Sequence, residues 1–308
     1  YKIMYYKNRG SAMTTHFKLR AYGKINLGLD VLRKREDGYH EVKMIMQTVG
    51  LFDQIDLFKS GEPGIRIETN LPYLPVNENN LVYQAARLLM EEFQIKDGLN
   101  IRLRKLIPVA AGMAGGSSDA AAVLVGLNKM FRLGLSEEEL MNRGVKLGAD
   151  VPYCIMRGTV LSEGIGEKLT PLPPVPQCQV LLAKPAISVS TKFVYENLHI
   201  DQFSSEEHPD VDGMVHAIEK GDLYGIADRL GNVLEKVTVK KYPVIEEIKD
   251  YMRRAGAIGT LMSGSGPTVF GLFVNPKAAA DAYEELRYGS RRDLARQVYL
   301  TNIYNPKR

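Results

Sequence analysis

A glycine-rich segment followed at once by an alanine-rich helix constrains this chain more than any other feature. Residues 108–119 read PVAAGMAGGSSD, and a helix is predicted to run from Ser117 to Phe131. Glycine lets a backbone turn sharply and come close to a ligand. At the start of the helix, free N–H groups and the positive end of the helix dipole favour an anion, so phosphate is the expected occupant. The two serine hydroxyls can bond phosphate oxygens or ligate a bound Mg²⁺.

The residues alone leave two interpretations of this segment open. A flexible loop whose glycines only allow a helix to pack closely on a strand would have a similar composition. The Gly-Gly-Ser-Ser run that opens the helix favours the phosphate interpretation. The segment is neither a P-loop, because GxxxxGK[ST] is absent, nor a GxGxxG motif. No lysine follows the glycines, so a cation that neutralises phosphate has to come from elsewhere in the chain.

Alternation of apolar and polar residues predicts that the first half of the chain mixes strands with helices. The Asp37-Gly38 pair predicts a tight turn between two extended runs. Ser136 and Glu139 form a capping-box pattern at the start of a helix that is predicted to end near Leu147. The predicted strands are residues 17–22, 24–32, 42–49, 54–59, 64–69 and 99–105, and another helix is expected over residues 78–93.

Four prolines in six residues, within the segment 164–177, mark the expected domain boundary. Proline can neither continue a helix nor pair in a central strand. Because 308 residues exceed the comfortable size of one core, we expect two domains, residues 13–165 and 166–308, after a tag or extension over residues 1–12. The second domain is predicted to contain strands at 179–184, 257–262, 267–274 and 297–303 and helices at 211–236, 243–254 and 276–287, the last with Asn275 as its cap and Pro276 in its first position.

Composition and charge argue against several classes of partner. The net charge is only +4 and the basic residues are scattered, so neither nucleic acid nor an anionic membrane surface is expected as a partner. No apolar stretch approaches the roughly 20 residues that span a bilayer. The two cysteines, Cys154 and Cys178, have no CxxC spacing, which favours a reduced, cytoplasmic compartment over a disulfide framework or a zinc site.

Three segments, in order, resemble the signature motifs of the GHMP kinases. PVAAGMAGGSSDAA resembles the PxxxGLGSSAA-type loop of that superfamily, with Met113 where leucine is usual. KINLGLDV (24–31) resembles its N-terminal motif, and LMSGSGPTVFGLF (261–273) resembles its C-terminal glycine-rich motif. Within the superfamily, KINLGLDVLRKREDGYHEV (24–42) and LGADVPYC (147–154) resemble the 4-diphosphocytidyl-2-C-methyl-D-erythritol kinases rather than mevalonate or homoserine kinases.

The resemblance implies an α+β chain with the two-domain GHMP kinase fold. The N-terminal domain would be like domain 2 of ribosomal protein S5, and the C-terminal domain would be a ferredoxin-like α/β sandwich. The implied activity is transfer of the γ-phosphoryl group of ATP, with Mg²⁺, to the 2-hydroxyl of 4-diphosphocytidyl-2-C-methyl-D-erythritol in the methylerythritol phosphate pathway to isoprenoid precursors. A small-molecule substrate and a monomer or weak homodimer are expected. Two alternatives stay open: another GHMP kinase, acting on homoserine, mevalonate or a sugar, and a non-catalytic nucleotide-binding relative.

The resemblance also assigns individual residues. The catalytic lysine and aspartate of the family fall on Lys24 and Asp150. An aromatic pair that sandwiches the cytosine falls on Tyr39 and Tyr195, and Thr191, in the strand-like run 187–195, borders the same pocket. The full set of substrate-binding positions is Asn26, Tyr39, His40, Thr191, Tyr195, Gly264 and Ser265. The ATP-binding positions are Pro108, Val109, Ala110, Ala111, Gly112, Met113, Ala114, Gly115, Gly116, Ser117 and Ser118.

From the residues alone, a structural role stands beside each of these assignments. Asp150 is placed to take the proton of a hydroxyl, but from the residues alone an aspartate that caps a turn before a proline is the commoner case. Lys24 could hold Asp150 ionised and contact the γ-phosphate, or could lie on the exposed face of a strand. His40 would suit base recognition beside Tyr39, although a lone histidine after a turn is common. The glycines and serines from 263 to 266 could form a purely structural turn.

Overall fold

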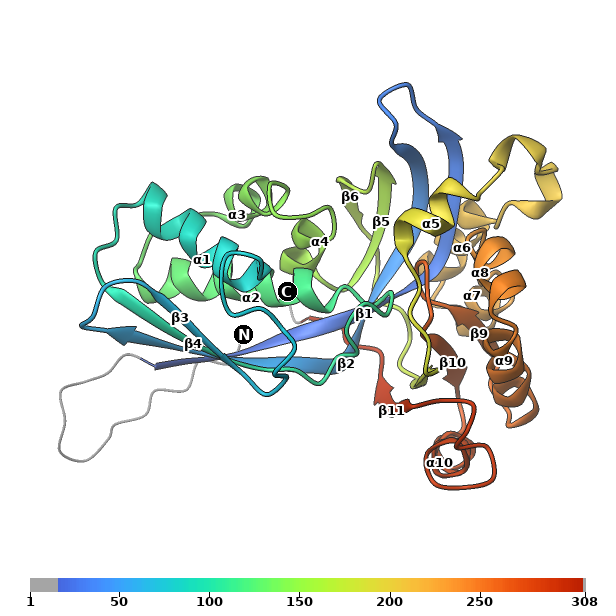
Figure 1. The fold of residues 1–308 in the computed structure, drawn as a ribbon. Coiled ribbons are helices and arrows are strands. Elements are labelled where there is room, and N and C mark those ends of the chain that lie inside the picture. Colours follow the sequence, from blue (N-terminus) through green and yellow to red (C-terminus); the bar gives the residue numbers. More distant parts are fainter. Residues whose placement is uncertain (1–15, 307–308) are drawn as a thin grey trace. The chain divides into compact units, whose positions relative to one another are not determined.

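The computed structural model describes residues 16–306, which form two compact units whose elements are labelled in Figure 1. The first unit contains residues 16–23, 52–109 and 114–156, and the second contains residues 24–51, 110–113 and 157–306. Two long strands, β1 (His16–Lys34) and β2 (His40–Ser60), contribute residues to both units. The units therefore interleave along the sequence, and the boundary expected between 165 and 166 stays a prediction. The expected extension, residues 1–12, lies outside the described residues.

β1 and β2 are each longer than predicted. β1 replaces the predicted strands 17–22 and 24–32, and β2 replaces 42–49 and 54–59. The separate strands were expected because glycine and polar residues interrupt the apolar pattern, yet the chain stays extended through these interruptions. The predicted tight turn between the two strands is confirmed, since Gly38 has φ of +85° and donates its N–H to the Arg35 carbonyl over 3.1 Å.

The sheet of the first unit has the strand order β3–β4–β2–β1, where β3 is Ile65–Thr69 and β4 is Gly98–Arg104. β4 runs parallel to β3 and antiparallel to β2. In β4 the side chains of Ile101 and Leu103 are buried while Arg102 and Arg104 are exposed. This alternation with a period of two gives the sheet one apolar face, as the sequence pattern predicts.

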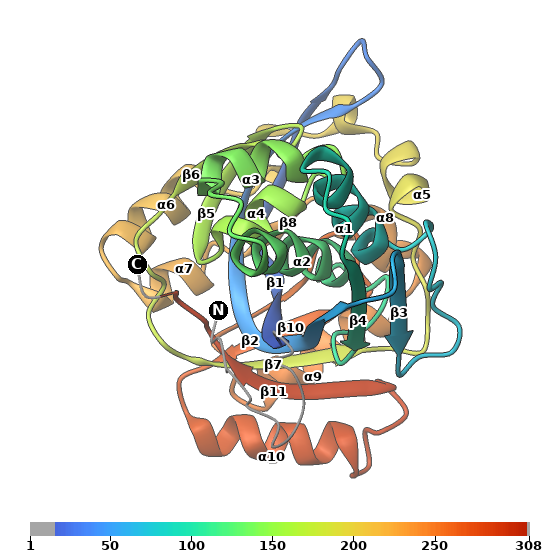
Figure 2. The ribbon, with the colours of Figure 1, turned by 90° about the vertical axis from the view of Figure 1, so that its left-hand side faces the viewer.

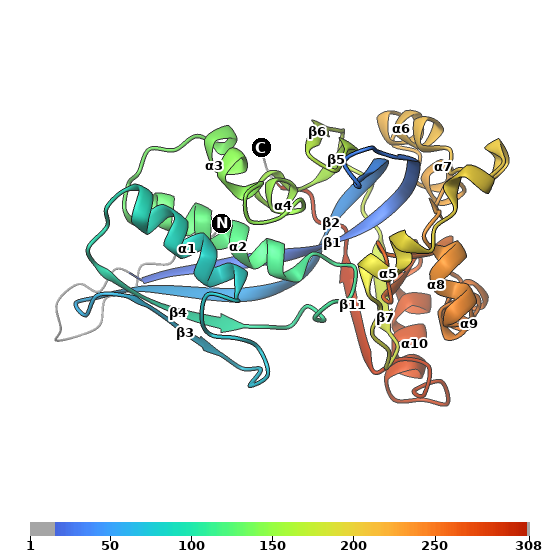
Figure 3. The same cartoon turned by 45° about the horizontal axis from the view of Figure 1, so that its top comes forward.

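Two helices of the first unit, α1 (Leu81–Glu92) and α2 (Gly115–Met130), pack against each other and cover one face of this sheet (Figure 3). A Cβ atom on Gly126 of α2 would lie 2.5 Å from Cδ1 of Leu19 and 2.6 Å from Cδ1 of Leu57. An added Cβ would force the ends of both leucine side chains to move, so glycine favours this close approach of α2 to β1 and β2. The glycine at this point fixes how α2, and with it the end of the glycine-rich segment, sits on the sheet.

Two shorter helices complete the first unit. α3 (Glu137–Gly144) begins with the predicted capping box, in which Ser136 and Glu139 each bond the other's backbone N–H. The helix ends at Gly144, three residues before the predicted end. α4 (Val151–Met156) was not predicted, because six residues are too few to show a helical period. Pro152 lies in its first turn, where the missing N–H is no disadvantage.

In the second unit, β5 (Thr159–Gly164) pairs antiparallel with the 42–47 part of β2 and with β6 (Lys168–Pro171). The segment 164–177 that was predicted as a boundary therefore contains the strand β6. β6 pairs with β5 alone and lies at an edge. An edge position tolerates Pro171, which has no N–H to donate to a ladder.

The second unit also contains a four-stranded antiparallel sheet with the strand order β11–β7–β10–β9. Its strands, β7 (Gln179–Lys184), β9 (Gly259–Met262), β10 (Val269–Phe273) and β11 (Gln297–Asn302), confirm the four predicted ones to within two residues at each end. α9 (Val244–Arg254) and α10 (Pro276–Arg287) pack on this sheet, and Figure 2 shows α10 beside β11. Asn275 caps α10 and Pro276 takes its first position, as predicted.

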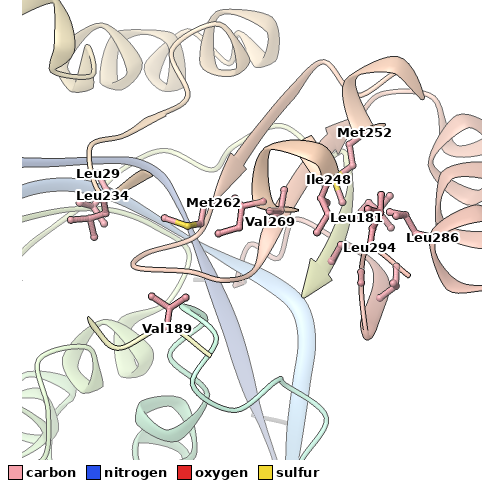
Figure 4. Packing of buried hydrophobic residues seen from close by; sticks show 14 of the residues in the cluster. Leu29, Leu181, Val189, Leu234, Ile248, Met252, Met262, Val269, Leu286 and Leu294 are labelled. Atoms are coloured by element: carbon pink, nitrogen blue, oxygen red, sulfur yellow. The ribbon is translucent and has the colours of Figure 1, made fainter. Parts of the chain in front are cut away.

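The core of the second unit lies between this sheet and its helices. Leu181 and Val269 from the strands pack with Ile248 and Met252 of α9 and Leu286 of α10 (Figure 4). Each of these side chains is almost completely buried. Burial stabilises the fold by about 1.5–3 kcal/mol for each such side chain. Among residues 16–306 no helix has both the length and the apolar character needed to cross a membrane.

Two predictions for the second unit are wrong. Residues 187–195, predicted as extended, contain the helix α5 (Thr191–Glu196), in which Ser190 accepts the N–H of Phe193. The β-branched residues of this run favour a strand locally, but the serine cap and the burial of Val194 stabilise a helical turn. Two short 3₁₀ helices, η1 (Ile200–Gln202) and η2 (Ser205–Glu207), follow it.

The single helix predicted over residues 211–236 is the second error. It consists of α6 (Val211–Glu219), α7 (Leu223–Ala227), the short strand β8 (Gly231–Asn232) and the beginning of α8 (Glu235–Lys241). Gly221, with φ of +65°, ends the first of these helices, and Asp222 caps the second through the N–H of Gly225. A glycine in the left-handed region usually ends a helix, and an aspartate cap usually begins one. The prediction missed both signals because the apolar residues keep a helical period across them.

Candidate active site

The backbone of the glycine-rich segment contains three residues in the left-handed region. Ala110 has φ of 49°, Gly112 has φ of 75° and Ala114 has φ of 53°. For a residue other than glycine this region costs about 1–2 kcal/mol. Such strained residues cluster at functional sites, and turns of this kind direct successive N–H groups into a concavity that binds anions. Two alanines held in this conformation therefore support a binding role for the segment.

The N-terminus of α2 has no side-chain cap. Ala114 occupies the cap position, and the N–H groups of Gly115, Gly116 and Ser117 have no acceptor in the part of the chain that the structure describes. Uncapped N–H groups at the positive end of a helix dipole are suited to an anion. α2 begins two residues before the predicted Ser117, so both glycines belong to its first turn and present their own N–H groups.

The two serines of the first turn differ in their surroundings. Ser118 is buried and its hydroxyl donates to the Tyr22 carbonyl over 2.7 Å, which ties α2 to β1 within the first unit. Ser117 is half-buried, and a Cβ atom at Gly148 would lie 3.9 Å from its hydroxyl oxygen. The hydroxyl of Ser117 is therefore more available to a ligand than that of Ser118, whose proton already has an acceptor. Both cofactor roles stay predictions.

A buried ion cluster that the sequence analysis missed lies beside the start of α2. Nζ of Lys105 binds a carboxylate oxygen of Asp53 and, over 2.6 Å, one of Asp119. Asp53 also accepts the backbone N–H groups of Leu106 and Ile107. Since Lys105 precedes the glycine-rich segment and Asp119 is the last residue of that segment, the cluster joins its two ends. The three residues lie far apart in the sequence, and no motif connects them.

The charges of this cluster do not balance if both carboxyl groups are ionised. Burial, together with neighbouring Asp53, raises the pKa of Asp119 well above its ordinary value, against the opposing effect of Lys105. Burial would lower the pKa of Lys105, but Asp119 and Asp53 outweigh it and raise that pKa. A charged lysine can offset one buried carboxylate, and a second is costly. The environment therefore favours a proton on Asp119 and keeps Lys105 cationic.

Asp150 lies in the turn between α3 and α4 and is half-buried. Its backbone carbonyl accepts the N–H of Cys154 over 3.0 Å. Its carboxylate has no hydrogen bond or ion pair within residues 16–23, 52–109 and 114–156 of the first unit. In a turn-capping role the carboxylate would accept a nearby backbone N–H. The local geometry shows no such bond, so the carboxylate is available for a ligand.

Lys24 and Asn26 point to the same side of β1, two residues apart. Lys24 is only 5% exposed, which contradicts the alternative of a lysine on an exposed strand face. Its Nζ donates to Oδ1 of Asn26 over 2.5 Å, and its backbone N–H donates to the Met113 carbonyl over 3.1 Å. No carboxylate pairs with Lys24 within residues 24–51, 110–113 and 157–306 of the second unit. A buried ammonium group without a counter-charge is costly, so this position suits an anionic ligand.

The tip of the glycine-rich segment, residues 110–113, packs against the C-terminal glycine-rich motif within the second unit. The Ser263 hydroxyl donates to the Gly112 carbonyl over 2.8 Å. A Cβ atom on Gly112 would lie 2.0 Å from the Ser263 carbonyl oxygen, so only glycine fits there. A Cβ atom on Gly264 would lie 3.5 Å from Oδ1 of Asn26. Within the second unit the structure thus brings Lys24 and Asn26 together with residues 110–113 and residues 263–264.

The predicted acceptor residues of the second unit form two further contacts. The hydroxyls of Thr191 and Ser265 are 2.8 Å apart. The ring of Tyr195, on the same helix α5, lies against the ring of His40 with centroids 5.0 Å apart. Tyr39 is 61% exposed, so its ring is accessible to a ligand. Burial, and then the charge of Lys34, lower the pKa of His40, which keeps its imidazole neutral at neutral pH.

Within residues 16–306 no group of three His, Cys, Asp or Glu side chains is arranged to hold a metal ion. Mg²⁺ that enters with a nucleotide needs only one or two protein oxygens, since phosphates and water supply the rest. In the first unit the Ser117 hydroxyl and the Asp150 carboxylate are of the right chemistry. The donor set therefore fits a Mg²⁺ carried by nucleotide phosphates.

Two family models match the chain. The model described as GHMP kinases N terminal domain matches residues 80–158, and the one described as GHMP kinases C terminal matches residues 214–290. The first range includes the glycine-rich segment and Asp150. Together with the mixed α and β structure, the two matches confirm the predicted two-domain α+β fold class.

Similar proteins bear the name that the motifs suggest. The 4-diphosphocytidyl-2-C-methyl-D-erythritol kinase of Lachnoclostridium phytofermentans is 57% identical over 289 residues, which cover 94% of this chain and 98% of the relative. The kinase of the same name from Lachnospira eligens is 54% identical over 94% of this chain and 99% of its own.

Solved structures agree with this likeness. A crystal structure of 4-(cytidine 5'-diphospho)-2C-methyl-D-erythritol kinase matches with a TM-score of 0.78 and 32% identity, over 94% of this chain and 100% of that one. A homoserine kinase from Cytophaga hutchinsonii matches with a TM-score of 0.73 but only 21% identity, over 96% of this chain and 98% of its own, and shows a shared fold alone. The predicted family resemblance is confirmed.

Proposed function

Since this chain belongs to the GHMP kinases and, among them, to the 4-diphosphocytidyl-2-C-methyl-D-erythritol kinases, we propose that it phosphorylates the 2-hydroxyl of that compound with ATP. The products are ADP and the 2-phosphate, an intermediate of the methylerythritol phosphate pathway to isoprenoid precursors. The observation that carries this proposal is the 57% identity over 94% of the chain to a kinase of that name. It is a small-molecule phosphotransferase, and the geometry of the glycine-rich segment suits that chemistry.

For the donor, the uncapped N–H groups of Gly115, Gly116 and Ser117 bind the ATP phosphates. The left-handed turns at Ala110 and Ala114 shape the backbone around them. A Mg²⁺ ion that enters with the phosphates would offset their charge and help to orient the terminal phosphoryl group. The Ser117 hydroxyl is the protein oxygen that suits this ion best in the first turn of α2.

For the transfer, Asp150 acts as the general base and Lys24 as the cation. The hydroxyl oxygen of the acceptor attacks the γ-phosphorus, its proton passes to the Asp150 carboxylate, and the bond to the bridging oxygen of ADP breaks. A tertiary hydroxyl is a weak nucleophile, so a carboxylate within reach of its proton assists the reaction. Lys24, buried and without a carboxylate partner in its own unit, stabilises the charge of the transferring group.

For the acceptor, Tyr39 and Tyr195 stack on the two faces of the cytosine. The neutral imidazole of His40 bonds the edge of the base, which distinguishes cytosine from uracil. Asn26, Thr191, Gly264 and Ser265 hold the rest of the molecule. Stacking contributes about 1–3 kcal/mol per ring, by analogy with the binding of single-stranded nucleic acids.

We also infer a cytoplasmic location. Cys154 and Cys178 are buried and neither forms a disulfide. Burial raises the pKa of the Cys178 thiol to about 12, which makes that thiol unreactive. Two buried, reduced thiols and the use of ATP with a cytidine-linked phosphate substrate are both consistent with a reducing compartment that is rich in ATP.

A transfer assay with separate acceptors tests the function. With ATP and MgCl₂, the protein is expected to release ADP in step with phosphorylation of 4-diphosphocytidyl-2-C-methyl-D-erythritol, and to be far slower with the uridine analogue, homoserine or mevalonate. Equal rates with the cytidine and uridine compounds would discard the pocket of Tyr39, His40 and Tyr195. Transfer to homoserine or mevalonate alone would assign another GHMP activity, and ATP binding without any transfer would indicate a non-catalytic relative.

A further inference from the structure

We propose that Asn232 is a positioning residue for the kinase reaction, because it holds the peptide group between Gly264 and Ser265 in one orientation. The inference rests on the proposed function, in which these two residues contact the acceptor. Asn232 belongs to none of the three signature motifs and lies in the segment GNVLE, residues 231–235. Its role follows from contacts that lie wholly within the second unit.

The side-chain amide of Asn232 is buried and fully bonded. Nδ2 donates to the carbonyls of Met262 and Gly264, each over 2.8 Å. Oδ1 accepts the N–H of Leu234 over 3.0 Å. The opposite orientation of the amide would place its oxygen against two carbonyl oxygens, so these contacts define which atom is the donor. One side chain therefore fixes two carbonyls of the C-terminal glycine-rich motif.

Fixing the Gly264 carbonyl also fixes the next N–H. In a trans peptide the carbonyl and the N–H point in opposite directions. With the Gly264 carbonyl directed at Asn232, the Ser265 N–H points away from it, and this N–H has no acceptor among residues 16–306. Gly264 has φ of +58°, and a glycine would otherwise allow the peptide to rotate at little steric cost. Asn232 removes that freedom.

The support beneath Asn232 is rigid. β8 pairs with β1, with Asn232 opposite Leu29, and the Val233 N–H donates to the Leu29 carbonyl over 3.1 Å. Leu29 and Leu234 both belong to the hydrophobic cluster, and Figure 4 labels them at the same end of the view. Because strand pairing and core packing both hold this segment in place, the side-chain amide of Asn232 has a fixed position.

Two side chains of α8, Glu235 and Thr238, also bond the backbone of the loop. Glu235 accepts the Met262 N–H over 2.8 Å, and its other oxygen binds Lys249 over 2.7 Å. The Thr238 hydroxyl donates to the Ser265 carbonyl over 3.3 Å. Asn232, Glu235 and Thr238, which are spaced three residues apart, thus bond the backbone of the loop at Met262, Gly264 and Ser265.

The acceptor is the ligand that this arrangement serves. Ser265, whose N–H is left without an acceptor, shares a hydrogen bond between its hydroxyl and that of Thr191 on α5, the helix that carries Tyr195. A backbone N–H beside the acceptor residues suits an anionic oxygen of the cytidine diphosphate group, and hydrogen bonds to ionised acceptors are among the strong ones. Asn232 acts on this contact through the peptide and touches no substrate itself.

Asn232→Asp is the direct test, with CDP and ADP as the ligands in calorimetric titrations. The substitution keeps the shape but sets a carboxylate oxygen against two carbonyls, which expels the Gly264 carbonyl. We expect the Kd of CDP and the KM of the acceptor to rise about tenfold or more, with the Kd of ADP within about twofold of the wild type. Asn128→Asp is the matched control, because Asn128 also bonds one backbone carbonyl and one N–H, both of Leu135, outside the proposed site.

Two outcomes would overturn the inference, and two further cases have a defined alternative test. CDP affinity and acceptor KM within twofold of the wild type would overturn it, and so would an equal loss of ADP and CDP affinity, which would indicate general loosening. If Asn232→Asp does not fold, Asn232→Ala removes both donors without adding a charge, and the same expectations apply. If the wild type binds CDP but phosphorylates no cytidine acceptor, the proposed function fails, and the CDP titrations still decide the role of Asn232.

Discussion

Replacing Gly112 with alanine tests whether the tip of the glycine-rich segment has to sit where the structure places it. The new Cβ would lie 2.0 Å from the Ser263 carbonyl oxygen, whereas ordinary contact is about 3.5 Å, so the two segments must separate by about 1 Å or more. Displacement of reacting groups by about 1 Å costs roughly 100-fold in rate. We therefore expect kcat to fall by about two orders of magnitude, and the free energy of unfolding to fall by about 1–3 kcal/mol from overpacking.

Gly134→Ala is the control for this experiment. Gly134 has the same φ of +75° as Gly112, but an added Cβ meets nothing within 4 Å. Both variants carry the cost of alanine in the left-handed region, about 1–2 kcal/mol, and only Gly112→Ala adds the clash. Steady-state kinetics with ATP and the cytidine acceptor, together with thermal unfolding, separate the two effects. If Gly112→Ala loses no more activity than Gly134→Ala, the close packing of the two motifs is irrelevant to the reaction.

Three further substitutions address the charged groups. Asp150→Asn is expected to lower kcat by about 10²–10⁴-fold with the Kd of ADP nearly unchanged, and an unaltered kcat would remove Asp150 from its role as the base. Lys24→Met is expected to lower kcat by more than about 100-fold without lowering Tm, since it removes a buried charge that has no ion pair in its unit; retained activity would contradict the assignment. Asp119→Asn should change the pH dependence of stability. Burial and Asp53 raise the pKa of Asp119, so the folded wild type keeps a proton that the unfolded chain releases above about pH 4. This group therefore makes the free energy of unfolding fall as the pH rises, by at most about 1.4 kcal/mol per pH unit. The variant should therefore gain stability relative to the wild type as the pH rises above about 4 in urea unfolding. A difference that does not change with pH would show that the pKa of Asp119 is not raised in the folded state.

Much of the secondary structure is visible in local patterns. The strand Gln179–Lys184 and the helix Pro276–Arg287 match their predictions at both ends, because a clear apolar period coincides with strong caps and breakers. The segment Thr191–Glu196 shows the limit of such reasoning. Its β-branched residues favour an extended chain, but tertiary packing of Val194 and a cap from Ser190 outweigh that propensity.

Some residues of the candidate site can likewise be predicted from the local sequence, and others depend on contacts between residues that are distant in the sequence. The glycines of 108–119 are readable because glycine at a tight turn before a helix has a direct physical meaning. Lys24 and Asp150 could be assigned only by resemblance, since one lysine in a strand and one aspartate in a turn are ordinary. Lys105 and Asn232 were missed altogether. Each acts through partners more than ten residues away, and nothing in a single sequence marks such pairs.

These missed residues answer a question that the glycine-rich motifs raise. Glycine, alanine and serine supply almost no side chain, so a loop made of them cannot hold its own conformation and loses much entropy when it is ordered. The order has to come from outside the loop. Within the first unit, Lys105, which directly follows β4, binds Asp53 of β2 and Asp119 of α2, the helix whose first turn contains the end of the glycine-rich segment. Within the second, Asn232 and its neighbours hold the backbone of residues 262–265. Ligand contacts and structural support are thus assigned to different residues, and substitutions in the supporting set should change kinetics without removing any group that touches substrate.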